Sequence, residues 1–117
     1  MLASFLNDIR DGDKIVPKRL ADRLSLPLTR LSKLAHVNRN ALTAAPNSPA
    51  VQDKLGEIAR IISKASELTE DEGASIIWFK YQTIPGFGGK TAAQLVEEGK
   101  ADAVLWYIDS VDDGGVA

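Results

Sequence analysis

The stretch IPGFGGKT, residues 84–91, ends in Gly-Lys-Thr, a combination that binds nucleotide phosphates when it lies in a P-loop. It follows the apolar run SIIWFKYQT and precedes AAQLVEEGK, which has the composition of a helix. A P-loop has the form G-x-x-x-x-G-K-[ST], because its N–H groups must wrap around the phosphates. The residue five positions before Gly89 is Ile84 and not a glycine. The spacing therefore argues against a phosphate loop.

The segment AVLWYID, residues 103–109, imitates the strand of a nucleotide-binding enzyme that ends in a magnesium-binding Asp. It starts about a dozen residues after the loop, and a single parallel crossover already takes that many residues. The glycines of PGFGG therefore need another purpose. We expect them to supply positive φ angles for a tight loop and to allow close approach of another backbone. Phe87 between them either fills the core or is offered to a partner.

Composition places the chain among soluble globular proteins, since 44% of its 117 residues are hydrophobic and 26% are charged. It has no cysteine and one histidine, which argues against disulfides, a zinc site or a histidine-based catalytic site. No apolar run reaches the roughly 18 residues of a membrane span, and the N-terminus lacks a secretory pattern. We expect a cytoplasmic protein that is not an enzyme and has no cofactor or metal.

Charge divides the chain into two parts. Residues 1–48 hold eight Lys and Arg against four Asp and Glu, whereas residues 49–117 hold six against twelve. A basic part joined to an acidic part indicates two surfaces with different partners. Random clustering of charges is the alternative explanation.

Helical periodicity and capping signals predict an all-α fold with about seven helices and no strand. Thr69 and Glu72 have the spacing of a capping box, which predicts a helix over 70–82. Thr91 is placed to cap a short helix that ends near Gly99. The remaining helices are expected over 17–25, in two short pieces on either side of His36, over 50–68, and from residue 101 to Val111.

The segment RLSKLAHVNRNAL, residues 30–42, has the pattern of a DNA-binding helix-turn-helix. Ser32 is the small residue at the helix crossing, His36 stands at the turn, and Asn38 is a good N-cap for the second helix. Arginine and asparagine read guanine and adenine, so residues 38–40 are the base-reading candidates. The predicted DNA-binding residues are Arg19, Thr29, Arg30 and Lys33 near phosphates, and Asn38, Arg39 and Asn40 in the major groove. His36 replaces the usual glycine, and a plain helical hairpin is the alternative.

The second half, EGASIIWFKYQTIPGFGGKTAAQLVEEGKADAVLWYIDSVDDG, resembles the toxin-binding domain of the Xre/MbcA/ParS antitoxins. The matching positions are Ala74, Trp78-Phe79, Pro85, Gly88-Gly89-Lys90-Thr91, Leu95, Gly99, Ala103-Val104, Ile108 and Gly114. The upstream helix-turn-helix and the long helix also lie where the family has them, so the resemblance covers about residues 17–115. Phe79 and Ala93 depart from the family's frequent Leu and Pro.

This resemblance implies an antitoxin with an N-terminal helix-turn-helix region, residues 1–48, and a toxin-binding domain, residues 49–117. It implies a homodimer or higher oligomer that covers the active site of a RES-domain, NAD-consuming toxin and represses its own operator DNA. The toxin-facing candidates are Pro85, Phe87, Gly88, Gly89, Lys90, Thr91, Asp109, Asp112, Asp113 and Gly114. A stand-alone transcriptional regulator, whose C-terminal domain oligomerises or binds another partner, is the alternative.

Several side chains in this region have two interpretations. The acids of residues 97–113 either complement a basic toxin mouth or are simply solvated. We expect Trp78 and Trp106 to anchor the core. Lys90 either binds a toxin carboxylate or caps the loop, and Thr91 is expected to be an N-cap.

Overall fold

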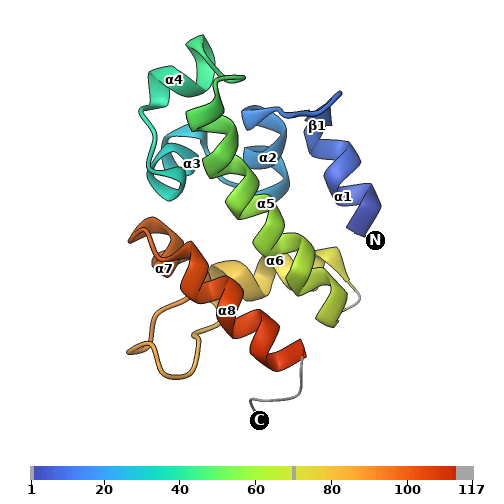
Figure 1. The fold of residues 1–117 in the computed structure, drawn as a ribbon, viewed down its shortest axis with the longest axis vertical. Helices are drawn as coiled ribbons and strands as arrows, with labels where there is room; N and C mark the ends of the chain where they lie inside the picture. Colours follow the sequence, from blue (N-terminus) through green and yellow to red (C-terminus); the bar gives the residue numbers. More distant parts are fainter. Residues whose placement is uncertain (1, 70, 113–117) are drawn as a thin grey trace.

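A long helix, α5 (Pro49–Thr69), forms the axis of the molecule, and shorter helices pack around both of its ends (Figure 1). The computed structural model describes residues 2–69 and 71–112. Within these residues the other elements are α1 (Leu2–Ile9), β1 (Arg10–Asp11), β2 (Lys14–Ile15), α2 (Pro17–Leu24), α3 (Leu28–Ala35), α4 (Arg39–Ala44), α6 (Glu72–Tyr81), α7 (Ala92–Glu97) and α8 (Ala101–Asp112). The all-α prediction is confirmed.

The N-terminal segment holds the elements that the sequence did not predict. β1 and β2 form a two-residue antiparallel hairpin, in which Arg10 pairs with Ile15. The Gln52 side chain on α5 accepts from the Ile15 N–H and donates to the Ile15 carbonyl, each at 2.9 Å. Gln52 thus replaces a third strand, and it fixes the hairpin and the adjoining α1 to the long helix. Phe5 and Ile9 of α1 are fully buried.

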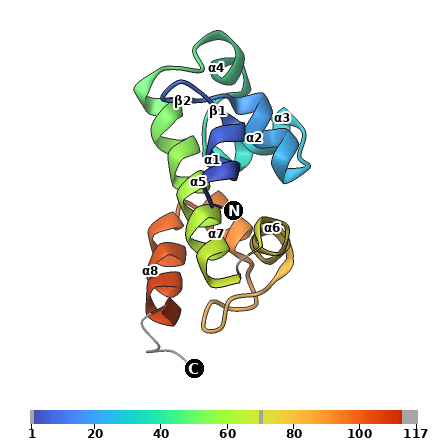
Figure 2. The same ribbon diagram turned by 90° about the vertical axis from the view of Figure 1, so that its right-hand side faces the viewer.

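The C-terminal helices use α5 as a shared wall. In Figure 2, α6 and α8 lie on either side of the C-terminal half of α5, and α7 connects them. The contact between α5 and α6 includes a buried pair of hydroxyl groups, Ser66 and Ser75, whose oxygens are 2.8 Å apart. Small side chains at this contact allow the two helices to approach closely. Phe79 of α6 is completely buried.

Two capping predictions had different outcomes. Thr91 caps α7 in a full capping box with Gln94, as expected. The box at Thr69 and Glu72 was wrong, because α5 continues to Thr69 and the cap of α6 is Asp71, which accepts from the Gly73 N–H at 3.0 Å. An Asp in extended conformation is as good a cap as Thr, so the error moved the helix start without removing the helix.

The N-terminal and C-terminal parts are joined by polar contacts. Arg23 of α2 bonds to Glu72 of α6, and Lys80 of α6 donates to the Leu24 carbonyl at 2.8 Å. No helix in the described part of the chain is long and apolar enough to cross a membrane.

Candidate functional site

The glycine loop between α6 and α7 has a rigid base. Thr83 and Thr91 form an isolated antiparallel bridge, and the Ile84 N–H donates to the Lys90 carbonyl at 2.8 Å. Ile84 itself is buried. Within the loop, the N–H groups of Phe87 and Lys90 donate to the carbonyls of Ile84 and Phe87 at 3.3 Å. These N–H groups are used internally, and the element before the loop is a helix, so the geometry is not that of a P-loop.

The tip of the loop depends on glycine. Gly86, Gly88 and Gly89 have φ angles of 86°, 68° and 79°, in the left-handed region that favours glycine. The first part of the glycine prediction is therefore confirmed. Close approach of another backbone is not seen, since nothing among the described residues lies within 4 Å of a Cβ placed on any of the three. The tip is exposed, together with Pro85.

Three loop residues are engaged within the molecule. Phe87 is half-buried and packs against the core, which supports the core-filling interpretation. The Lys90 Nζ lies 2.8 Å from the Glu98 carboxylate, so it ties the loop to the end of α7. This hydrogen bond lowers the pKa of the Glu98 carboxyl below its usual value, and Lys100 adds to the effect. Thr91 serves as the cap of α7.

The outer face of α8 exposes a large aromatic side chain. Trp106 is 62% exposed, so its prediction as a core anchor was wrong. The buried residues Val104 and Ile108 define the inner face, and Trp106 lies two residues, about 200° of helical rotation, from the first of them. The helical spacing alone therefore predicts that Trp106 faces solvent. The prediction of a core anchor was wrong because it relied on the preference of Trp for burial and not on this spacing. Trp78, by contrast, is half-buried and packs against the core.

Acidic side chains surround this exposed Trp. Asp102 and Asp109 lie one helical turn away on either side, and both are exposed. Asp109 binds Lys64 of α5 at 2.7 Å. Asp112 is exposed at the end of α8, while Asp113 and Gly114 lie outside the described residues. Within residues 2–69 and 71–112, Asp102 and Asp112 have no ion-pair partner, so these two acids keep their charge available.

An apolar hollow lies between α5, α6 and α8. Its volume is about 180 Å³, and it is lined by Ala65, Leu68, Thr69, Trp78, Tyr107, Ile108 and Val111. The volume is below the 300 Å³ or more of typical small-molecule sites, so the hollow fits one apolar side chain better than a cofactor.

The basic part contains two short helices, α3 and α4, joined by residues 36–38. His36 ends α3 with a φ of 56°, which confirms the turn position, and Asn38 caps α4 by accepting from the Asn40 N–H at 2.8 Å. Ser32 and Leu42 are buried, as the pattern requires. The geometry of the predicted hairpin is thus present, whereas its use on DNA is a separate question.

The structure brings only some of the predicted DNA-binding residues together. Residues 38–40 lie side by side at the start of α4, and Thr29 and Lys33 follow one face of α3; all five are exposed. Arg30 and Arg19 are engaged elsewhere. The Arg30 guanidinium binds the Glu97 carboxylate of α7 at 3.1 Å, and Arg19 donates to the Arg10 carbonyl at 2.6 Å.

Glu97 connects α3 to α7 through two contacts. Its carboxylate binds Arg30, and its backbone carbonyl bonds to the His36 ring nitrogen Nε2. Sequence reasoning missed this connection because the two residues are 61 positions apart. His36 therefore has a structural partner.

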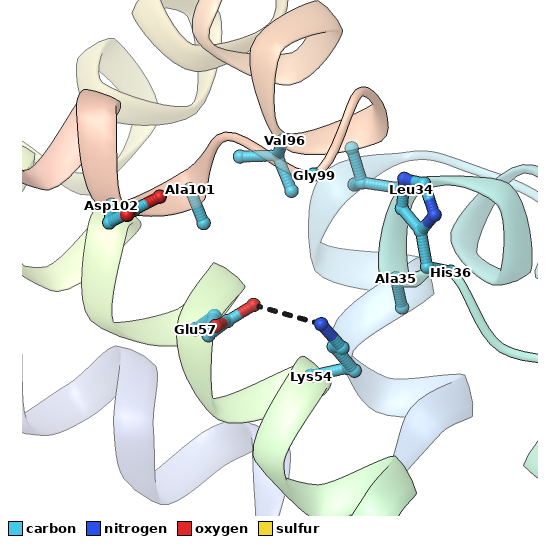
Figure 3. A pocket seen from close by; sticks show the side chains of 9 residues that line it. All are labelled: Leu34, Ala35, His36, Lys54, Glu57, Val96, Gly99, Ala101 and Asp102. Carbon is cyan, nitrogen blue, oxygen red and sulfur yellow. Dashed lines mark ion pairs between the residues drawn. The ribbon is translucent and has the colours of Figure 1, made fainter.

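A small polar cavity of about 40 Å³ adjoins this connection (Figure 3). Lys54 and Glu57, one turn apart on α5, form an ion pair of 3.9 Å in its wall. The volume is too small for an organic ligand. No group of three or more potential metal ligands occurs within the described residues.

Residues 64–114 match the model of a protein family described as the antitoxin Xre/MbcA/ParS C-terminal toxin-binding domain. The match supports the resemblance: this segment, which comprises the end of α5, the glycine loop and helices α6 to α8, is similar to an antitoxin toxin-binding domain. No curated protein and no solved structure gave a significant match.

Proposed function

We propose that the chain is the antitoxin of a type II toxin–antitoxin pair and that it neutralises a RES-domain, NAD-consuming toxin in the cytoplasm. The observation that carries this proposal is the family match over residues 64–114. Inhibition is steric, because the antitoxin covers the toxin's active site and performs no catalytic step of its own. The NAD-consuming toxin type rests on the family resemblance of the sequence.

The toxin contact combines the loop tip with the outer face of α8. The tip, residues 85–89, protrudes on a base held by hydrogen bonds, so little conformational entropy is lost when a partner binds it. Trp106 is the expected hot spot, since Trp is enriched among residues that dominate binding energy. Lys90 and Thr91 support the loop, and their roles are to hold its shape.

Fewer acids on this surface are free to pair with a basic toxin than the sequence indicated. Glu97, Glu98 and Asp109 are each neutralised by a basic residue of the same chain. Asp102 and Asp112 are the described acids on α8 that can complement a basic NAD-binding mouth. Asp113 and Gly114 remain candidates from the sequence.

The proposal includes autorepression through α3 and α4. Arg39 and Asn40 are exposed at the start of α4, where base-reading residues of a helix-turn-helix lie. Thr29 and Lys33 are the phosphate candidates that the fold leaves exposed, while Arg19 and Arg30 must first leave their present partners. The division into residues 1–48 for DNA and 49–117 for toxin, in a homodimer or higher oligomer, is part of the proposal.

Co-expression with the product of the adjacent reading frame tests the proposal. We expect a stable complex in size exclusion, and loss of the toxin's NAD consumption when the two proteins are mixed. A matched pair of variants, Arg39→Ala and Lys54→Ala, separates the two activities. We expect Arg39→Ala to lose binding to the upstream DNA and to retain toxin inhibition, whereas Lys54→Ala retains both.

If no complex forms and the toxin's NAD consumption is unchanged, the proposal that the chain is an antitoxin is wrong. DNA binding that persists in that case would favour the stand-alone regulator.

A further inference from the structure

The exposed face of α3 contains an arginine whose hydrogen-bond donors are already in use. Thr29, Arg30 and Lys33 lie at positions i, i+1 and i+4 of the helix, so they share one face, and all three are exposed. The Arg30 guanidinium is paired with α7, since its Nη1 and Nη2 lie 3.5 Å and 3.1 Å from the two carboxylate oxygens of Glu97. A guanidinium binds a phosphate with the same pair of donors. The Glu97 carboxylate therefore occupies the position that a DNA phosphate would take.

The pairing lowers the positive charge that α3 offers to DNA. Glu97 cancels the charge of Arg30, so among the described residues of this face only Lys33 still adds positive charge. The Glu97 carboxylate also repels a phosphate that approaches Arg30, because the two are like charges. Binding of proteins to DNA depends strongly on the number of cations that reach phosphates. The free chain is thus one cation short on its predicted DNA surface.

The backbone of Glu97 is fixed next to α3 independently of its side chain. The His36 ring nitrogen Nε2 donates to the Glu97 carbonyl, and His36 ends α3 at the turn that leads to α4. On the other side, the carboxylate of Glu98 is bound by Lys90 and Lys100. The end of α7 therefore stays beside α3 when the ion pair breaks, and the carboxylate remains available to bind Arg30 again.

The ion pair is weak enough for DNA to displace it. The side chains of Arg30 and Glu97 are 50% and 33% exposed, and exposed ion pairs contribute little to stability. A DNA backbone presents a dense row of phosphates that competes for the same guanidinium. The contact therefore reduces the affinity for DNA and does not abolish it.

We propose that Glu97 is an autoinhibitory residue, which limits DNA binding by holding Arg30 until a phosphate displaces its carboxylate. The inference deepens the proposed function and rests on its DNA-binding part. It names a regulatory contact within the chain, between the region predicted to bind DNA and the end of α7.

Two isosteric variants test the proposal. Glu97→Gln and Glu98→Gln each remove one negative charge from the end of α7, and the two side chains are similarly exposed, at 33% and 38%. Of the two, Glu97 binds Arg30, whereas Glu98 binds Lys90 and Lys100. Fluorescence anisotropy with a labelled duplex from the upstream DNA gives the affinities. We expect Glu97→Gln to bind about three- to fivefold more tightly than Glu98→Gln, the range of an exposed ion pair.

The same comparison on unrelated DNA should give the same ratio, because a phosphate contact carries no sequence information. In an Arg30→Ala background, Glu97→Gln should bind no more tightly than Glu98→Gln, since no guanidinium remains to be released. Circular dichroism confirms that each variant is folded.

Equal affinities of Glu97→Gln and Glu98→Gln, or a gain that persists without Arg30, would overturn the inference and leave the proposed DNA binding intact. If neither the natural chain nor any variant binds DNA, the proposed DNA binding is wrong and the inference fails with it.

Discussion

Helices α6 and α8 flank the same long helix, and each exposes a large apolar side chain to nearly the same degree, yet their outer faces differ in charge. On α8, Trp106 stands between Asp102 and Asp109, which gives an aromatic centre with an acidic rim. On α6, Ile77 lies in the uncharged run of residues 73–79, and the Lys80 that precedes Tyr81 donates to the Leu24 carbonyl. The first pattern is typical of a binding surface for a basic partner, whereas the second has no acidic rim.

The inner faces of the two helices do not show this difference. Phe79 of α6 and Val104 of α8 are both completely buried in one core. The two helices are therefore equivalent as parts of the fold and specialised only on their outer sides. Exposure alone would have grouped Ile77 with Trp106, whereas the charge of their neighbours separates them.

The largest effect is expected from the inner side of α6. Phe79→Ala removes a fully buried ring and should lower the free energy of unfolding by about 3–5 kcal/mol. Ile77→Ala, on the outer side of the same helix, should lower it by less than about 1 kcal/mol in the monomer. Urea denaturation at low protein concentration measures both. Equal losses of unfolding free energy in the two variants would mean that Ile77 is packed as tightly as Phe79, and would contradict the assignment of Ile77 to an exposed face.

The next effect concerns toxin binding. Trp106→Ala should weaken the complex by about 2 kcal/mol, roughly 30-fold in the dissociation constant, as for a hot-spot residue. Tyr81→Ala, on the outer side of α6, should change the affinity for toxin by less than about threefold. Titration calorimetry with purified toxin gives both values. A reversed order would assign the toxin to α6.

A smaller effect is expected at Thr91, which connects the loop to α7. Thr91→Ala should cost about 1 kcal/mol of stability through loss of the N-cap, and Thr91→Ser should restore most of it. Thermal denaturation measures the series. If Ser rescued stability but not toxin affinity, Thr91 would be a toxin contact as well as a cap.

The smallest effect is the pH response of Glu98. Its pKa is lowered from the usual 4.5 by the hydrogen bond from Lys90, so the folded state favours the ionised carboxylate. The associated stability is present above pH 4.5 and is lost as the pH falls through the lower folded pKa. Carbon-13 NMR should give a Glu98 midpoint below 4.5, and Lys90→Met should raise it. If the Glu98 midpoint is the same in Lys90→Met, the Lys90–Glu98 contact between the loop and the end of α7 does not form in solution.

Much of this fold could be predicted from local signals. Pro17 opens α2, Thr91 caps α7 and the spacing of Val104 and Ile108 orients α8, because each signal involves neighbours in sequence. The β1–β2 hairpin was missed because it is held by Gln52, far along the chain. The α1 helix had a local signal, the helical spacing of the buried Phe5 and Ile9, which the prediction did not use. The position of Arg30 was equally unpredictable, since its partner Glu97 is 67 residues away.

The sequence also predicted the candidate site only in part, because some of its features are local and others depend on distant residues. The positive φ angles of the loop glycines follow from their residue type, whereas the neutralisation of Glu98 and Asp109 depends on tertiary contacts. Trp106 shows the opposite case. Its helical spacing already indicated exposure, and the preference of Trp for burial led the prediction astray.

The central claim is that this chain inhibits its toxin through the face that carries Trp106. The most direct test is a titration of the toxin's NAD consumption with the natural chain, Trp106→Glu and Ile77→Glu. We predict complete inhibition at one chain per toxin for the natural chain and for Ile77→Glu, and residual NAD consumption for Trp106→Glu. Undiminished NAD consumption with the natural chain, or full inhibition by Trp106→Glu, would contradict the claim.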